Sequence, residues 1–140
     1  MDNLNENRKA NVLLIEDNPA EVRMIYEIFK EFDPQIGLNV FDNGIEALEF
    51  LNKEEKYENK VDPYLILLDL NIHLLTGFEV LEKIKNNDKL KDIPVLVLTN
   101  SSDKEDFLKV QKLKGDCYII KPLGYDEYKD VLHHVRKCWL

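Results

Sequence analysis

VLLIEDNP, residues 12–19, is the stretch of sequence that decides the fold of this chain. Its first half is a short apolar run bounded by polar residues, which is typical of a strand buried in a parallel sheet. Its second half predicts the start of a helix, because Asn18 is a good N-cap residue and Pro19 suits the first turn. The stretch therefore predicts a strand that passes directly into a helix, with Glu16 and Asp17 at the junction.

The same strand–helix unit recurs along the chain. Three more apolar runs are LILL at 65–68, VLVL at 95–98 and YII at 118–120, and a shorter run is LNVF at 38–41. Apolar residues at helical spacing follow each run, and Ile45 and Phe107 are among those expected to face the core. The expected strands are 11–16, 38–41, 64–69, 94–99 and 116–120, and the expected helices begin near residues 18, 44, 77, 103 and 125.

Five strand–helix units predict an α/β fold, with helices on both faces of a parallel sheet. A closed barrel of eight such units typically needs about 250 residues, and this chain has 140. Right-handed crossovers in an open sheet favour a doubly wound, flavodoxin-like arrangement with strand order 2-1-3-4-5. We expect one domain at residues 11–140 after a loose polar tail at residues 1–10.

The composition narrows the range of partners. The net charge of −8, from 19 basic and 27 acidic side chains, argues against direct contact with nucleic acid, which needs clustered Lys and Arg. Cys117 and Cys138 are too few for a disulfide framework and lack a metal-binding spacing. No apolar stretch approaches the length of a membrane span, and the polar N-terminus lacks a secretory signal. These features predict a cytoplasmic protein with no membrane partner.

Polar residues stand where the apolar runs end, and they form a matched set. In an open α/β sheet, ligands bind outside the carboxyl ends of the strands, at the point where the strand order reverses. Three carboxylates brought together there repel one another unless one is protonated or a cation binds, and Mg²⁺ prefers oxygen ligands. Three acids, a divalent ion and one lysine balance in formal charge, which suits an incoming phosphoryl group. The residues of the set are Glu16, Asp17, Asp69, Thr99 and Lys121.

One of these carboxylates could act as a nucleophile and form an aspartyl phosphate. The chain has neither a GxxxxGK[ST] loop nor a GxGxxG loop, the two common cradles for nucleotide phosphates. The phosphoryl group must therefore come from another molecule.

Five motifs in this order resemble the response-regulator receiver domains of two-component signalling. They are IEDN at 15–18, LLDLN at 67–71, Gly77, VLTN at 97–100 and YIIKP at 118–122, and the likeness spans residues 11–138. The resemblance implies that Asp69 accepts a phosphoryl group from a sensor histidine kinase or a histidine phosphotransfer protein. It implies that Thr99 and Lys121 contact this group, and that the Mg²⁺ ligands are Glu16, Asp17, Asp69 and the backbone carbonyl of Asn71.

The resemblance also implies a conformational switch. Tyr118 occupies the position of the family's switch aromatic, so Thr99 would move toward the phosphoryl group while the ring of Tyr118 moves inward. This changes the surface formed by residues 103–113, 116–120 and 125–138, so the output would be protein–protein contact or phosphorelay. The family usually has a cis bond at the position of Lys121–Pro122. With no output domain in the sequence, the chain resembles single-domain regulators that pair with phytochrome-like or other sensor kinases.

Several points stay open from the sequence. His73, Thr76 and Asn100 depart from the family pattern and leave the phosphate lifetime and the choice of partner undecided. Thr99 could be only a helix-entry residue, and Tyr118 an ordinary sheet aromatic.

One alternative function is a haloacid-dehalogenase-like phosphatase, although its second Asp would fall at Asn71. Another is a receiver-shaped scaffold that needs no phosphorylation. The sequence does not settle the downstream target or whether the chain forms a homodimer.

Overall fold

Five parallel strands form one sheet in the order β2-β1-β3-β4-β5, which confirms the predicted strand order. The computed structural model describes residues 11–140, so the predicted tail at residues 1–10 lies outside the described residues. Each strand begins and ends within about one residue of its predicted limits. The strands are β1 (Asn11–Ile15), β2 (Gly37–Phe41), β3 (Leu65–Leu68), β4 (Val95–Thr99) and β5 (Cys117–Ile120).

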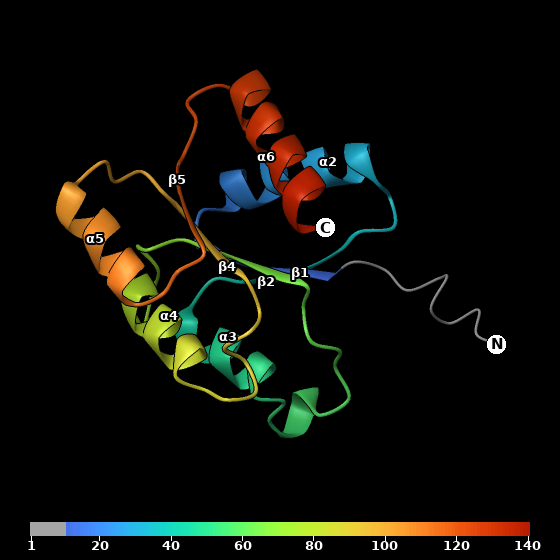
Figure 1. Cartoon of the computed structure of the whole chain (residues 1–140). Coiled ribbons are helices and arrows are strands. Elements are labelled where there is room, and N and C mark those ends of the chain that lie inside the picture. Colours follow the sequence, from blue (N-terminus) through green and yellow to red (C-terminus); the bar gives the residue numbers. More distant parts are fainter. Residues whose placement is uncertain (1–10) are drawn as a thin grey trace.

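Helices cover both faces of the sheet, as the doubly wound fold requires. Helices α2 and α6 lie on one face, and α3, α4 and α5 lie on the other (Figure 1). Within the described chain, no helix is long and apolar enough to span a bilayer. The helices are α2 (Pro19–Phe32), α3 (Gly44–Leu51), α4 (Gly77–Lys85), α5 (Lys104–Lys112) and α6 (Tyr125–Trp139), with a short 3-10 helix, η1 (Glu55–Tyr57).

The three interior strands, β1, β3 and β4, are buried on both sides, which explains their unbroken apolar sequences. In β1, Leu13 packs in the cluster beneath α3, α4 and α5, while Leu14 packs in the cluster beneath α2 and α6. Strands β1 and β3 pair directly, with Ile15 opposite Leu68. The residues that follow these strands are therefore neighbours at the carboxyl edge of the sheet.

The junction between β1 and α2 forms as the sequence predicts. The Asn18 side chain accepts hydrogen bonds from the backbone N–H groups of Ala20 (3.0 Å) and Glu21 (3.4 Å), and Pro19 is the first helical residue. These bonds satisfy donors that would otherwise be free at the helix start. The cap ends β1 sharply and holds the first turn of α2 beside the carboxyl edge of the sheet.

Two predicted core positions are wrong. Ile45 is 43% exposed, because α3 directs Ala47 toward the sheet and two residues of helix turn Ile45 to nearly the opposite side. Phe107 is 45% exposed. It lies at the edge of the α5 face that buries Val110, and its ring packs edge-on against Tyr118 with 5.5 Å between centroids.

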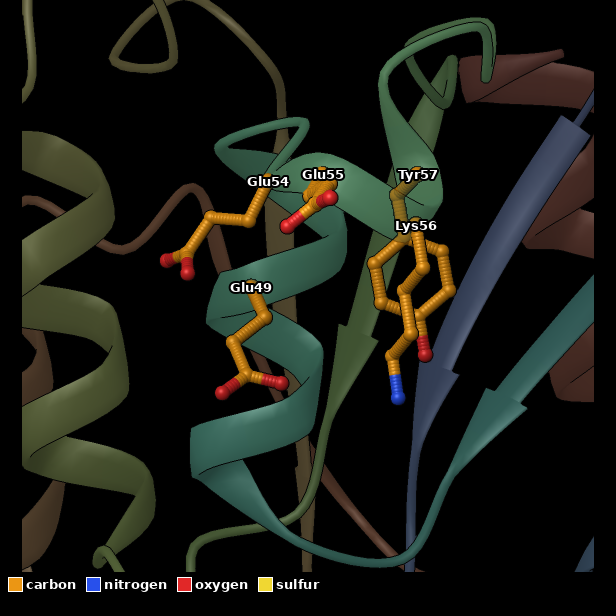
Figure 2. Close-up of a pocket in the computed structure, with 5 residues that line it drawn as sticks. All are labelled: Glu49, Glu54, Glu55, Lys56 and Tyr57. Carbon is orange, nitrogen blue, oxygen red and sulfur yellow. The ribbon is translucent and has the colours of Figure 1, made fainter.

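The charged stretch at 53–60 is predicted to be a frayed helix end and exposed loop, and it contains η1. The Tyr57 ring anchors this segment, because it packs edge-on against Phe41 and Phe50 with centroid distances of 5.9 and 5.4 Å. A hollow of about 430 Å³ lies between η1 and α3 (Figure 2), at the end of α3 away from the carboxyl edge of the sheet. Its lining residues are Glu49, Glu54, Glu55, Lys56 and Tyr57.

Candidate functional site

Three carboxylates converge at the carboxyl edge of the sheet, where the strand order reverses. Glu16 and Asp17 follow β1, and Asp69 follows β3; each contributes an oxygen atom, and these atoms lie within 4.8 Å of one another. Backbone bonds extend the ladder beyond the strands, since Asp69 N–H donates to the Ile15 carbonyl (3.0 Å) and Glu16 N–H donates to the Phe41 carbonyl (3.0 Å). The sheet itself therefore fixes the positions of the acids.

Lys121 reaches this cluster from the far side of β4. Its side chain is only 5% exposed, and its Nζ lies 2.9 Å from Glu16 Oε1 and 3.1 Å from Asp69 Oδ2. Its backbone N–H donates to the Thr99 carbonyl over 2.7 Å, which holds the residue against the end of β4. A lysine that follows the edge strand β5 thus places its charge beside acids that follow β1 and β3.

The ionisation of the cluster reflects its burial. Burial raises the pKa of Glu16 to about 7, and the nearby charge of Asp69 adds to this effect, while the ammonium of Lys121 opposes it. Burial on its own would lower the pKa of Lys121, but its hydrogen bond with Glu16 and the charges of Asp69 and Glu16 raise that pKa above its ordinary value. Lys121 therefore stays charged, and one ammonium does not neutralise all the acids around it.

The donor set of the acid cluster fits a hard divalent cation. Carboxylate oxygens are the ligands that Mg²⁺ and similar ions prefer, and the oxygens of Glu16, Asp17 and Asp69 are close enough to share one ion. Asp17 is the most accessible of the three, with 22% of its side chain exposed and Oδ2 lying 3.5 Å from His73 Nε2. The backbone N–H of Asn71 donates to Asp69 Oδ1 (3.1 Å). The role of the Asn71 carbonyl as a metal ligand stays a prediction.

Thr99 and Tyr118 are linked through the backbone of one residue. Thr99 is fully buried at the end of β4, and its Oγ1 accepts a hydrogen bond from Ser101 N–H (3.1 Å). The half-buried Tyr118 on β5 donates from its hydroxyl to the Ser101 carbonyl (2.8 Å). No sequence pattern pointed to this link, because both hydrogen bonds that make it use backbone atoms of Ser101.

Of the three residues that depart from the family pattern, Thr76 has a clear structural role. The Thr76 hydroxyl accepts a hydrogen bond from Glu79 N–H (3.2 Å), and the Glu79 carboxylate accepts one from Thr76 N–H (2.9 Å), so the pair forms a capping box at the start of α4. Gly77 follows because a Cβ there would lie 2.5 Å from the Asp69 carbonyl oxygen. The His73 carbonyl accepts from Gly44 N–H (3.2 Å), and Asn100 is exposed.

The expectation of a cis bond at Lys121–Pro122 is wrong. The described residues contain no cis peptide bond, so this bond is trans. The trans form is the intrinsically favoured isomer even before proline.

Glu21 is a site residue that sequence reasoning missed. It lies in the first turn of α2, and its carboxylate is 3.1 Å from Lys121 Nζ. Its Oε2 accepts a hydrogen bond from the Tyr128 hydroxyl of α6 over 2.9 Å. Burial and the charge of Glu21 raise the pKa of Tyr128, so this hydroxyl stays a donor. The available signal was the position of Glu21 in the first turn of a helix that starts at the carboxyl edge.

Comparison with known proteins agrees with this geometry. Residues 12–133 match the response regulator receiver domain family. The response regulator Rcp1 of Synechocystis is 36% identical over 129 residues, which cover 92% of this chain and 88% of Rcp1. The structure of Rcp1 in its Mn²⁺-bound form gives a TM-score of 0.87, with 94% of each chain covered. The structure of the phosphorylated cyanobacterial phytochrome response regulator RcpA is 33% identical and gives a TM-score of 0.90, again with 94% of each chain covered.

These matches cover nearly the whole described chain and include the segments that build the acid cluster. Neither alternative function, a haloacid-dehalogenase-like phosphatase or a scaffold without phosphorylation, finds support among them. Motifs, topology and likeness agree, and this chain belongs to the response regulator receiver domain family of phosphorelay signalling.

Proposed function

We propose that this chain is a phosphorylation switch in which Asp69 accepts a phosphoryl group from a sensor histidine kinase or a histidine phosphotransfer protein. The observation that carries the proposal is the position of Asp69, which is 5% exposed, lies within the acid cluster and is 3.1 Å from Lys121 Nζ. The likeness to the phytochrome response regulator RcpA supports a phytochrome-like kinase as one class of donor. We assign the receiver domain to residues 11–140 and its action to the cytoplasm.

The chemistry is one displacement at phosphorus. A carboxylate oxygen of Asp69 forms a bond to phosphorus, the phosphorus–nitrogen bond of the donor's phosphohistidine breaks, and the imidazole leaves with the electron pair. Catalysis of this kind depends mainly on positioning and charge stabilisation. The Lys121 ammonium and the Thr99 hydroxyl supply donors to the phosphoryl oxygens. Mg²⁺, held by Glu16, Asp17, Asp69 and the Asn71 carbonyl, would add positive charge next to the same oxygens.

The switch would pass through Ser101. If the Thr99 hydroxyl turns to the phosphoryl group, its bond with Ser101 N–H is lost, and the loop that also holds the Tyr118 hydroxyl is released. The Tyr118 ring then moves relative to Phe107, which changes the exposed surface of α5, β5 and α6. We infer that this surface carries the output, by contact with another protein or by phosphorelay.

The proposal predicts a phosphoryl adduct at Asp69. Protein incubated with Mg²⁺ and acetyl phosphate should gain the mass of one phosphoryl group in an intact-mass measurement. Asp69→Asn should gain none, because the amide does not supply the nucleophilic carboxylate. Asp92→Asn, which changes an exposed acid in the same way, should be modified like the wild type.

Two outcomes would contradict the proposed switch. Wild-type protein without a mass gain would remove Asp69 as an acceptor. Repeated turnover of a phosphoester substrate would instead indicate an enzyme that releases product, not a module that phosphorylates only itself.

A further inference from the structure

Glu21 is an additional acid bound to Lys121, and it lies outside the predicted set. An ammonium group has three N–H donors. In this structure they meet Glu16 Oε1 at 2.9 Å, Asp69 Oδ2 at 3.1 Å and the Glu21 carboxylate at 3.1 Å. The side chain of Glu21 is 19% exposed, so the contact is largely shielded from water. Every donor of Lys121 is therefore matched with its own carboxylate.

The three carboxylates around Lys121 have different roles in phosphorylation. Asp69 becomes the acyl phosphate and changes its charge and shape, while Glu16 would also hold the metal ion. Glu21 has neither role, because it projects from the first turn of α2 and is outside the three-acid cluster. Of these three carboxylates, Glu21 alone can keep the same contact with Lys121 before and after phosphoryl transfer.

Glu21 is itself held from the opposite side. The Tyr128 hydroxyl donates to Glu21 Oε2 over 2.9 Å, and Tyr128 is 2% exposed in the cluster between α2, α6 and the sheet. Hydrogen bonds in such a shielded place are stronger than in water, and neighbouring bonds polarise one another. The contacts from Lys121 through Glu21 to Tyr128 form one continuous chain from the acid cluster to α6.

We propose that Glu21 is a positioning residue for phosphoryl transfer, which holds the Lys121 ammonium beside Asp69 and connects it through Tyr128 to α6. This inference rests on the proposed function, in which Asp69 is the acceptor. An ammonium that is already fixed needs no reorganisation when charge develops on the phosphoryl oxygens. Glu21 adds one negative charge to the three acids considered from sequence, and the Tyr128 hydroxyl helps to stabilise that charge.

The first test measures the rate of phosphorylation by acetyl phosphate with saturating Mg²⁺. Glu21→Gln keeps the size of the side chain but loses its charge, and we expect a rate about tenfold lower, as for the loss of one hydrogen bond to a charged group. Tyr128→Phe should lower the rate less. The double variant should be no slower than Glu21→Gln alone, because both changes interrupt one chain of contacts. The matched control is Glu27→Gln, on the same helix in an exposed pair with Arg23, which should react at the wild-type rate.

The second test needs neither metal nor phosphodonor. In protein labelled with ¹⁵N-lysine, the Lys121 ammonium should give a slowly exchanging NMR signal, which Lys121→Arg identifies by its disappearance. Glu21→Gln should shift this signal and speed its exchange with water, whereas Glu27→Gln should leave it unchanged.

The two tests separate the two claims. If wild-type protein is not phosphorylated but the Lys121 signal responds to Glu21→Gln, the proposed function fails and the positioning role stands. A Lys121 signal that is the same in wild type and Glu21→Gln would overturn the positioning role, whatever the rate of phosphorylation.

Discussion

Glu16 is a buried acid whose pKa rises to about 7 on folding, from an ordinary value of 4.5. Between these values the folded protein holds a proton that the unfolded chain has released. The stabilising effect of this proton is therefore complete below about pH 4.5 and is lost as the pH rises toward 7. In buffer that contains a chelator to remove metal ions, the free energy of unfolding should fall over this pH range. Glu16 alone should account for up to about 3 kcal/mol of this fall.

Urea unfolding of Glu16→Gln at the same pH values isolates this contribution. The amide does not titrate, so the fall in stability between pH 5 and pH 7 should be smaller in the variant by the amount that Glu16 supplies. Equal pH dependence in the two proteins would contradict the raised pKa.

Sequence reasoning could find Glu16 but not Glu21, and the reason is geometric. Glu16 directly follows a buried strand, and parallel strands bring their carboxyl ends to one edge, so strand order alone predicts its neighbours. Glu21 lies on a helix, where an acidic residue in the first turn is usually explained by the helix dipole. Its contacts depend on Lys121 extending past the end of β4 and on Tyr128 of α6 lying beside α2. No local sequence pattern predicts the distance from Glu21 to either residue.

At the scale of elements, the start of α4 depends on the capping box of Thr76 and Glu79. Thr76→Ala removes the hydroxyl that accepts from Glu79 N–H, and it should lower the free energy of unfolding by about 1 kcal/mol, the usual effect of losing an N-cap side chain. The measurement is the urea midpoint at constant slope.

Thr76→Ser is the matched control for this prediction, because it keeps the hydroxyl and should keep most of the stability. If Thr76→Ala and Thr76→Ser unfold at the same urea concentration as the wild type, the cap contributes nothing. The test measures the structural role of Thr76 alone, because unfolding in urea does not depend on phosphate lifetime.

The limits of the elements were predictable, but the exact width of their buried faces was not. Strands β1 and β3 are found where apolar runs end in acids, since burial on both faces leaves little room for another pattern. Helical spacing predicts which side of a helix is buried, but it does not predict how wide the buried face is. Phe107 therefore fitted the spacing and still lies at the rim of α5, where it packs on Tyr118.

At the scale of the whole molecule, repulsion between the carboxylates of the acid cluster lowers the stability of the fold that brings them together. The order of the strands brings Glu16, Asp17 and Asp69 together, and Lys121 does not neutralise all of them. A divalent ion that binds only the folded protein should therefore raise its melting temperature. At about one hundred times its dissociation constant, Mg²⁺ should stabilise the fold by about 2.7 kcal/mol, or roughly 8 °C for a chain of this size.

The comparison must separate binding from general screening, because salt alone weakens the repulsion between acids. Thermal unfolding in MgCl₂ should therefore be measured against NaCl of equal ionic strength. Asp17→Asn should remove most of the Mg²⁺ effect. It is a better variant for this purpose than Asp69→Asn, because Asp17 contacts His73 and not Lys121, so the internal ion pairs stay in place. Equal melting temperatures in the two salts would show that the convergence of the acids serves some purpose other than holding a metal ion.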